Sequence, residues 1–140
     1  MATNISIRAG VHCVPYTMTG TSAEVIYTAP SDSGTIIQPI TLHIANNGSS
    51  ANHTVEFGQY RGTTGAGISY YTFYPTKSIT GNSFEDIDMS ALSLRANDTI
   101  RVTSAGGTDT TCFLSFSHVG AGEYSLMQPV TYTGSQNFGR

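Results

Sequence analysis

The chain has 140 residues, a formal net charge of −3 and only 11% charged residues. This length suits one domain that can bury a core without disulfide staples. Six Lys and Arg residues provide no basic patch for phosphate neutralisation, so nucleic acid is a poor candidate partner. No apolar run is long enough to cross a bilayer, and the N-terminus lacks the basic and hydrophobic regions of a signal peptide. We therefore expect a soluble protein made in a cytoplasm, with no membrane partner.

Alternating apolar and polar residues predict β-strands along most of the chain. Residues 5–15 form a strand or an extended arm, and residues 24–29 form a second strand that ends at a turn containing Pro and Gly, residues 30–34. A third strand covers residues 36–44. Because Pro39 cannot donate a ladder hydrogen bond, the first half of this strand is expected at a sheet edge or a bulge.

Two polar turns predict β-hairpins. Residues 46–50 join the third strand to a return strand at residues 53–57, and a Gly-Gly pair lies between strands at residues 99–103 and 112–116. The Gly-Gly pair supplies the positive φ angles that a chain reversal requires. The consecutive chain reversals at residues 29–34 and 46–50 indicate an antiparallel sheet.

The segment from residue 79 to residue 94 has no clear period. It is either a short helical turn around residues 85–88 or a strand that ends at Met89. Its three carboxylates are the ligands that calcium prefers, but their spacing does not match an EF-hand loop, which favours a solvated acidic turn. The Asn97-Asp98 pair predicts a polar turn, because both side chains bond nearby backbone amides and tolerate unusual φ angles.

An aromatic strand is expected just before Pro75. Aromatic faces match the apolar faces of sugar rings, so Tyr70, Tyr71 and Tyr74 are candidate residues for stacking against a ligand. A core also requires aromatic residues, and the chain has no Trp. Core packing is therefore the favoured prediction, and sugar binding is the alternative.

The sequence contains no pattern that indicates catalysis or a metal site, such as HExxH, CxxC or GxSxG. Four histidines are present, far apart and on or beside alternating strands: His12, His43, His53 and His118. His43 and His53, on the two arms of one predicted hairpin, are the pair most suited to a metal. Cys13 and Cys112 are the two cysteines, and nothing in the sequence fixes whether they pair. We predict that the chain is not an enzyme and has no cofactor.

The two ends of the chain are predicted to be arms. Residues 120–140 hold too many large apolar side chains for a disordered terminus and too little regularity for a strand of the same sheet. The candidate partner-binding residues are Ile5, Ile7, Tyr124, Leu126, Met127, Val130, Tyr132 and Phe138. Side-chain burial alone does not offset the entropy of ordering such an arm, so it requires backbone pairing with a neighbouring strand, as in a symmetric oligomer. The alternative is a last strand that folds back on its own domain.

Three stretches carry a family resemblance: residues 25–30 (VIYTAP), 42–47 (LHIANN) and 94–105 (LRANDTIRVTSA). Across residues 24–119 the chain resembles small β-sandwich virion proteins of tailed bacteriophages, which decorate or cement the capsid and have relatives among tail and fibre adaptor modules. It departs from their usual form at residues 60–69, where a longer loop replaces a simple acidic-Gly hairpin.

The resemblance implies an all-β, antiparallel β-sandwich, jelly-roll or immunoglobulin-like, without a cofactor. With the arms, the expected domains are an N-terminal strand or arm (1–15), a sandwich (16–119) and a C-terminal arm (120–140). The implied function is that of a capsid cement protein, a trimer bound to the major capsid protein on the virion surface. The alternative is a receptor-binding or carbohydrate-binding module associated with a tail or fibre.

Overall fold

The computed structural model describes the backbone of residues 11–62 and 67–120, and the side chains of these ranges up to residue 118. These residues form eight strands and one short 3₁₀ helix: β1 (Val11–Thr17), β2 (Glu24–Thr28), β3 (Thr35–Asn46), β4 (Ala51–Tyr60), β5 (Ile68–Ile79), β6 (Ser83–Asp88), β7 (Thr99–Ser104), η1 (Gly107–Asp109) and β8 (Thr110–Gly120). Among the described residues, no helix is long and apolar enough to cross a membrane.

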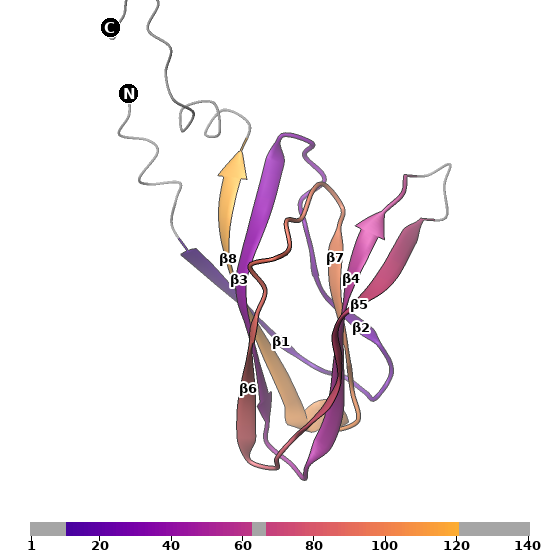
Figure 1. Cartoon of the computed structure of the whole chain (residues 1–140), viewed down its shortest axis with the longest axis vertical. Coiled ribbons are helices and arrows are strands. Elements are labelled where there is room, and N and C mark those ends of the chain that lie inside the picture. The colour runs from indigo at the N-terminus through magenta and orange to yellow at the C-terminus, as the bar shows by residue number, and fades with distance from the viewer. Residues whose placement is uncertain (1–10, 63–66, 121–140) are drawn as a thin grey trace, which may run out of the picture.

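The strands form two four-stranded antiparallel sheets that face each other (Figure 1). The first sheet has the order β1-β8-β3-β6 and the second has the order β2-β7-β4-β5. The pairs β4·β5, β3·β6, β2·β7 and β1·β8 are nested, as in one long hairpin whose tip lies between β4 and β5. Rolling this hairpin up adds the pairs β3·β8 and β4·β7 and gives an eight-stranded jelly roll. The predicted antiparallel sandwich is confirmed, and its strand order is that of a jelly roll.

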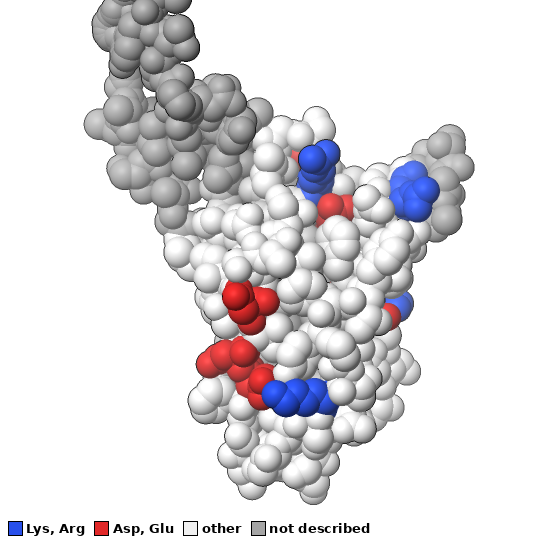
Figure 2. Space-filling view, in the orientation of Figure 1, with Lys and Arg blue, Asp and Glu red and all other residues white. Residues whose placement is uncertain are grey.

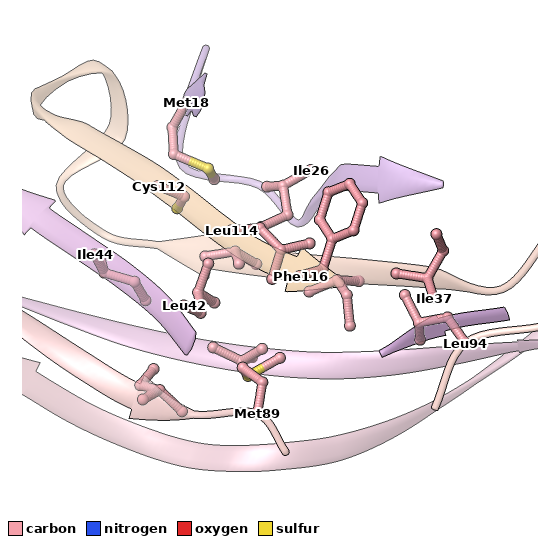
Figure 3. Close-up of a cluster of buried hydrophobic side chains, with 14 of the residues drawn as sticks. Met18, Ile26, Ile37, Leu42, Ile44, Met89, Leu94, Cys112, Leu114 and Phe116 are labelled. Atoms are coloured by element: carbon pink, nitrogen blue, oxygen red, sulfur yellow. The ribbon is translucent and has the colours of Figure 1, made fainter. Parts of the chain in front are cut away.

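The core lies between the sheets and follows the period of two along each strand. In β8, Cys112, Leu114 and Phe116 are buried, while the residues between them are half-buried on the outer side. Register places Leu114 opposite Leu42 of β3, and Figure 3 shows both side chains within one apolar cluster. Burial raises the pKa of the Cys112 thiol to about 12, so this cysteine is a packing residue.

Both predicted hairpins are wrong. β3 and β4 lie in opposite sheets, and so do β7 and β8, so residues 47–50 and 105–109 carry the chain from one sheet to the other. The turn chemistry is nevertheless present. Asn46 donates from Nδ2 to the carbonyls of Ser49 and Ile79, at 2.7 and 3.0 Å, and Gly107 adopts a φ of 55°. Turn residues therefore mark where the chain reverses, but not which strand it pairs with afterwards.

Two further expectations are corrected. Strand β5 continues beyond Pro75 to Ile79, because Pro75 lies on an edge strand close to a register shift, where a missing N–H is tolerated. The segment expected to be a solvated acidic turn is instead the strand β6, in line with the alternative that residues 79–94 contain a strand. Glu85 and Asp86 alternate in direction along it, so their carboxylates separate to different partners.

Two other local predictions are confirmed. Pro39 lies at a bulge in β3, and only the residues from Thr41 onward pair with β6. Asn97 has a positive φ of 66°, and Asp98 accepts a hydrogen bond from the Arg95 amide at 2.9 Å. The Asn-Asp turn therefore forms in the predicted way.

A buried histidine links the two sheets at the end where η1 lies. Nδ1 of His53 donates to the Ala51 carbonyl at 2.9 Å, and Nε2 lies 3.4 Å from Oγ1 of Thr110. Oγ1 of Thr110 in turn lies 2.7 Å from Oγ of Ser104. Burial lowers the pKa of His53 below its ordinary value of 6.5, because the charged imidazolium is poorly solvated there.

This histidine predicts a loss of stability at mildly acidic pH. The unfolded chain binds a proton at His53 more readily than the folded chain does. The stability that the neutral, buried His53 contributes is therefore fully present above pH 6.5 and declines as the pH falls below that value. We expect a lower urea midpoint at pH 5.5 than at pH 7.5. The His53→Gln variant is expected to lose much of this difference. An equal pH dependence in wild type and His53→Gln would contradict the assignment.

Candidate docking surface

Outward-facing side chains of the first sheet form a row across its strands. The registers place Phe113 of β8 opposite both Pro15 of β1 and His43 of β3, and His43 opposite Asp86 of β6. Phe84 lies two residues before Asp86 and therefore shares its outer face. We call Phe113, His43 and Phe84 the aromatic row.

His43 is held at the centre of the aromatic row. Its ring centre lies 4.8 Å from that of Phe84, with the planes at 28°, and 5.7 Å from that of Phe113, in an edge-on arrangement. Nδ1 of His43 lies 2.6 Å from Oδ1 of Asp86, which fixes the ring orientation by a hydrogen bond. The row is thus ordered before any partner binds, which reduces the entropy lost on docking.

Exposed apolar surface is concentrated on this sheet. Among the described residues, four of the six exposed large hydrophobic side chains belong to strands of the first sheet: Val11, Ile36, Ile40 and Phe84. Val11 is 65% exposed and Phe84 is 56% exposed. Exposed apolar patches on soluble proteins mark interaction sites more often than scattered single residues do. The outer face of the first sheet is therefore the candidate docking surface.

Carboxylates border the docking surface at β6. Figure 2 shows that charged side chains are sparse on the face in view and that the acidic ones gather over β6, beside a basic residue. Lys77 of β5 donates to Glu85 at 3.0 Å, and the Tyr74 hydroxyl donates to the same oxygen at 3.0 Å. These bonds hold the pKa of Glu85 below its ordinary value. The Ser90 side chain and amide likewise lower the pKa of Asp88, so this border is acidic.

The outer face of the second sheet has a different character. Nε of Arg101 donates to Oε1 of Glu56 at 2.6 Å, and the Arg101 guanidinium lies 3.5 Å from the centre of the Tyr70 ring. Next to them, the hydroxyls of Thr54 and Thr76 lie 2.7 Å apart. Polar groups on this face bond to one another, which leaves less apolar surface for a partner.

The three candidate stacking tyrosines do not share one face. Tyr70 points outward beneath Arg101, whereas Tyr74 packs against the core and donates to Glu85. Tyr71 is 51% exposed at the edge strand β5. In β5 the register shifts between Thr72, which pairs with Glu56, and Tyr74, which pairs with Val55. This bulge breaks the alternation of side chains, so the three rings do not form one flat surface for a ligand.

The structure separates the histidine pair chosen from the sequence. His43 lies on the outer face of the first sheet and His53 is buried, so the pair that the sequence made most suited to a metal is not brought together. Across the described parts of the chain, no group of three or more His, Cys, Asp and Glu side chains is placed to hold a metal. Cys13 is exposed and Cys112 is buried, and both are free thiols.

A different pair of histidines lies close together. The rings of His12 on β1 and His118 on β8 have their centres 6.3 Å apart, so the expectation that all four histidines are far apart is wrong. The proximity of His12 and His118 follows from the pairing of β1 with β8. These strands lie about a hundred residues apart, so the sequence pattern alone does not indicate this pair.

The predicted partner-binding side chains lie outside the described residues. This applies to Ile5 and Ile7 in the N-terminal segment and to all six candidates in residues 121–140. Their binding role stays a prediction. The strands from which the two segments continue are neighbours, since Val11 of β1 is opposite Ser117 of β8.

No protein-family model matches the chain, and no curated protein matches it in sequence. Among solved structures, a chain of the Bacillus endospore appendages, which form disulfide-linked pili, is 15% identical with a TM-score of 0.44, over 79% of this chain and 85% of that chain. A chain of infectious bursal disease virus, Gx strain, is 9% identical with a TM-score of 0.48, over 76% of this chain and 32% of that chain. A capsid chain of Helicobacter pylori bacteriophage KHP30 is 11% identical with a TM-score of 0.37, over 78% and 85%. The strand order itself identifies this chain as an eight-stranded jelly roll.

Proposed function

We propose that this chain is a non-enzymatic structural protein of a phage virion, a capsid decoration (cement) protein that binds the assembled capsid. The observation that carries this proposal is the unequal character of the two outer faces. Among the described residues, one sheet presents the aromatic row and most of the exposed large hydrophobic side chains. The other sheet presents polar groups that bond to one another. The resemblance of residues 24–119 to phage decoration proteins supports the same role.

The docking surface suits a broad protein partner. It lies on a sheet, whose backbone is already ordered, and its aromatic side chains supply large apolar contacts at little further loss of entropy. The proposed partner is the major capsid protein, at the outer surface of the virion. Weak contacts repeated over a lattice give strong binding to an assembled capsid and weak binding to a free subunit.

The proposal includes a trimer linked through the terminal segments. Both segments continue from one end of the first sheet, because β1 begins where β8 ends. Segments that leave side by side can reach the same neighbouring subunit. Light scattering of the full chain is expected to give the mass of a trimer, and a chain ending at residue 120, which retains all eight strands, is expected to give that of a monomer.

Cosedimentation with capsids tests the proposed role. We expect the full chain to sediment with assembled capsids of the phage that encodes it, and to remain in the supernatant with unassembled capsid protein. Binding is expected to saturate at a fixed number of copies per capsid and to persist in high salt, because the docking surface is mainly uncharged. Failure to sediment with capsids, or binding that disappears in salt, would overturn the proposal.

A second candidate function is receptor or carbohydrate binding at a tail or fibre. The observation that favours it is the exposure of Tyr71, whose ring face is suited to a sugar. This function predicts that the chain binds glycans of the host cell surface and that Tyr71→Ala removes binding. It would replace the cement role if glycan binding were found without capsid binding.

A further inference from the structure

Two histidines lie close together at the end of the first sheet where β1 begins and β8 ends. His12 is opposite Phe116 in the β1·β8 register, so His12 and His118 are diagonal neighbours. Their ring centres are 6.3 Å apart and their planes are nearly perpendicular, at 81°. The ring of His12 stacks on Phe116, with centres 5.5 Å apart, which limits its rotation.

The separation of the two rings is close to that of two imidazoles on one ion. Zn–N bonds are about 2.0–2.1 Å long, which places the ring centres roughly 5 Å apart at the tetrahedral angle that zinc prefers. The observed 6.3 Å is about 1 Å longer, and the rings meet edge-on. Both side chains must therefore rotate to bring a nitrogen of each ring to one ion, which requires no change in the strands.

We propose that His12 and His118 bind one divalent transition-metal ion, of the class of Zn²⁺, Ni²⁺ or Cu²⁺, with water in the other coordination positions. Imidazole nitrogen is a preferred ligand for these ions, whereas Ca²⁺ and Mg²⁺ select oxygen. The pair supplies two protein ligands, fewer than a closed structural zinc site has, so the bound ion remains open to exchange. The site is separate from the docking surface, because His12 and His118 point to the inner side of the sheet.

A bound ion would fasten the edge of the sandwich. Within the described part of the chain, β1 is an edge strand whose single partner is β8. An ion held by one histidine from each strand therefore adds a link across this pair. The link lies at the end of the sheet from which residues 1–10 and 121–140 continue. The expected consequence is slower exchange of the backbone amides of β1 when the metal is bound.

The full chain, prepared without a polyhistidine tag and freed of metal with a chelator, provides the test. Titration with Zn²⁺ in a calorimeter is expected to show one saturable site per chain. His12→Asn and His118→Asn are each expected to lower the affinity for Zn²⁺ at least about tenfold. Changing a residue that only supports a metal ligand already lowers metal affinity by about tenfold or more, and these variants remove a ligand itself. His43→Asn is the matched control, because it removes a histidine from the other face of the same sheet, and it is expected to bind like the wild type.

Histidine side-chain NMR gives a second readout that does not depend on variants. Zn²⁺ is expected to shift the imidazole nitrogen resonances of His12 and His118 and to leave those of His43 and His53 unchanged. The proposal would be overturned by the absence of saturable binding, by unchanged affinity in both His12→Asn and His118→Asn, or by shifts confined to other histidines. None of these results depends on whether the chain binds a capsid.

Discussion

Leu114→Ala is expected to lower the free energy of unfolding by about 2–5 kcal/mol, the range for removing a fully buried leucine side chain. Leu114 is buried in β8, between β1 and β3, with Val14 and Leu42 as its cross-strand neighbours. Both neighbouring strands are fixed by the sheet, so the cavity cannot close by a movement of one side chain. The loss is large against the total stability of about 5–15 kcal/mol that is typical of a domain.

Ser115→Ala is the matched control for this prediction. Ser115 is the next residue of β8 and lies on the outer side of the sheet. Its replacement is expected to change stability by about 0.5 kcal/mol or less. Urea denaturation of the two variants measures the difference. If Ser115→Ala were as destabilising as Leu114→Ala, the assignment of inner and outer sides in β8 would be wrong.

Asp98→Ala is expected to destabilise the chain by an amount on the order of 3 kcal/mol, because two backbone amides lose a charged acceptor. Oδ1 of Asp98 accepts from the amide of Tyr60 at 2.8 Å, and Oδ2 accepts from the amide of Arg95 at 2.9 Å. The carboxylate thus joins the end of β4 to the turn before β7. Asp98 itself is buried, and alanine leaves both donors without this partner.

Asp98→Asn separates the loss of hydrogen bonds from the loss of volume. Asparagine keeps the shape and one oxygen acceptor but turns an NH₂ group toward the second amide donor. Its destabilisation, measured by urea denaturation, is expected to lie between that of wild type and that of Asp98→Ala. A loss in Asp98→Ala no larger than that of an ordinary surface substitution would show that water replaces the carboxylate.

The strands were predictable from the sequence, but most of their partners were not. Alternation in residues 112–116 correctly separates buried from outward-facing side chains, because this period is a local property. Pairing is not local in a jelly roll. β7 and β8 follow each other closely and look like a hairpin, yet each pairs with strands far away in the sequence. A Gly-containing turn permits both a hairpin and a crossing between sheets, so turn chemistry cannot decide between them.

The docking surface was partly visible in the sequence. Phe113 and His43 occupy positions where alternation predicts an outward side chain, and a phenylalanine at such a position is a signal of an exposed apolar contact. Their proximity to Phe84 follows only from the order β8-β3-β6, which brings together residues about thirty to seventy positions apart. The His12–His118 pair was missed for the same reason.

The measurement that tests the central claim most directly is the affinity of docking-surface variants for assembled capsids. The Phe84→Ser and Phe113→Ser substitutions remove the two phenylalanines of the aromatic row, and Val25→Ser removes an exposed hydrophobic side chain from the second sheet as a control. Thermal unfolding first establishes that all three variants are folded. We expect each aromatic variant to lower affinity at least about tenfold, as interface anchors do, and Val25→Ser to bind like the wild type. Undiminished binding by both aromatic variants, or an equal loss in Val25→Ser, would contradict docking through the first sheet.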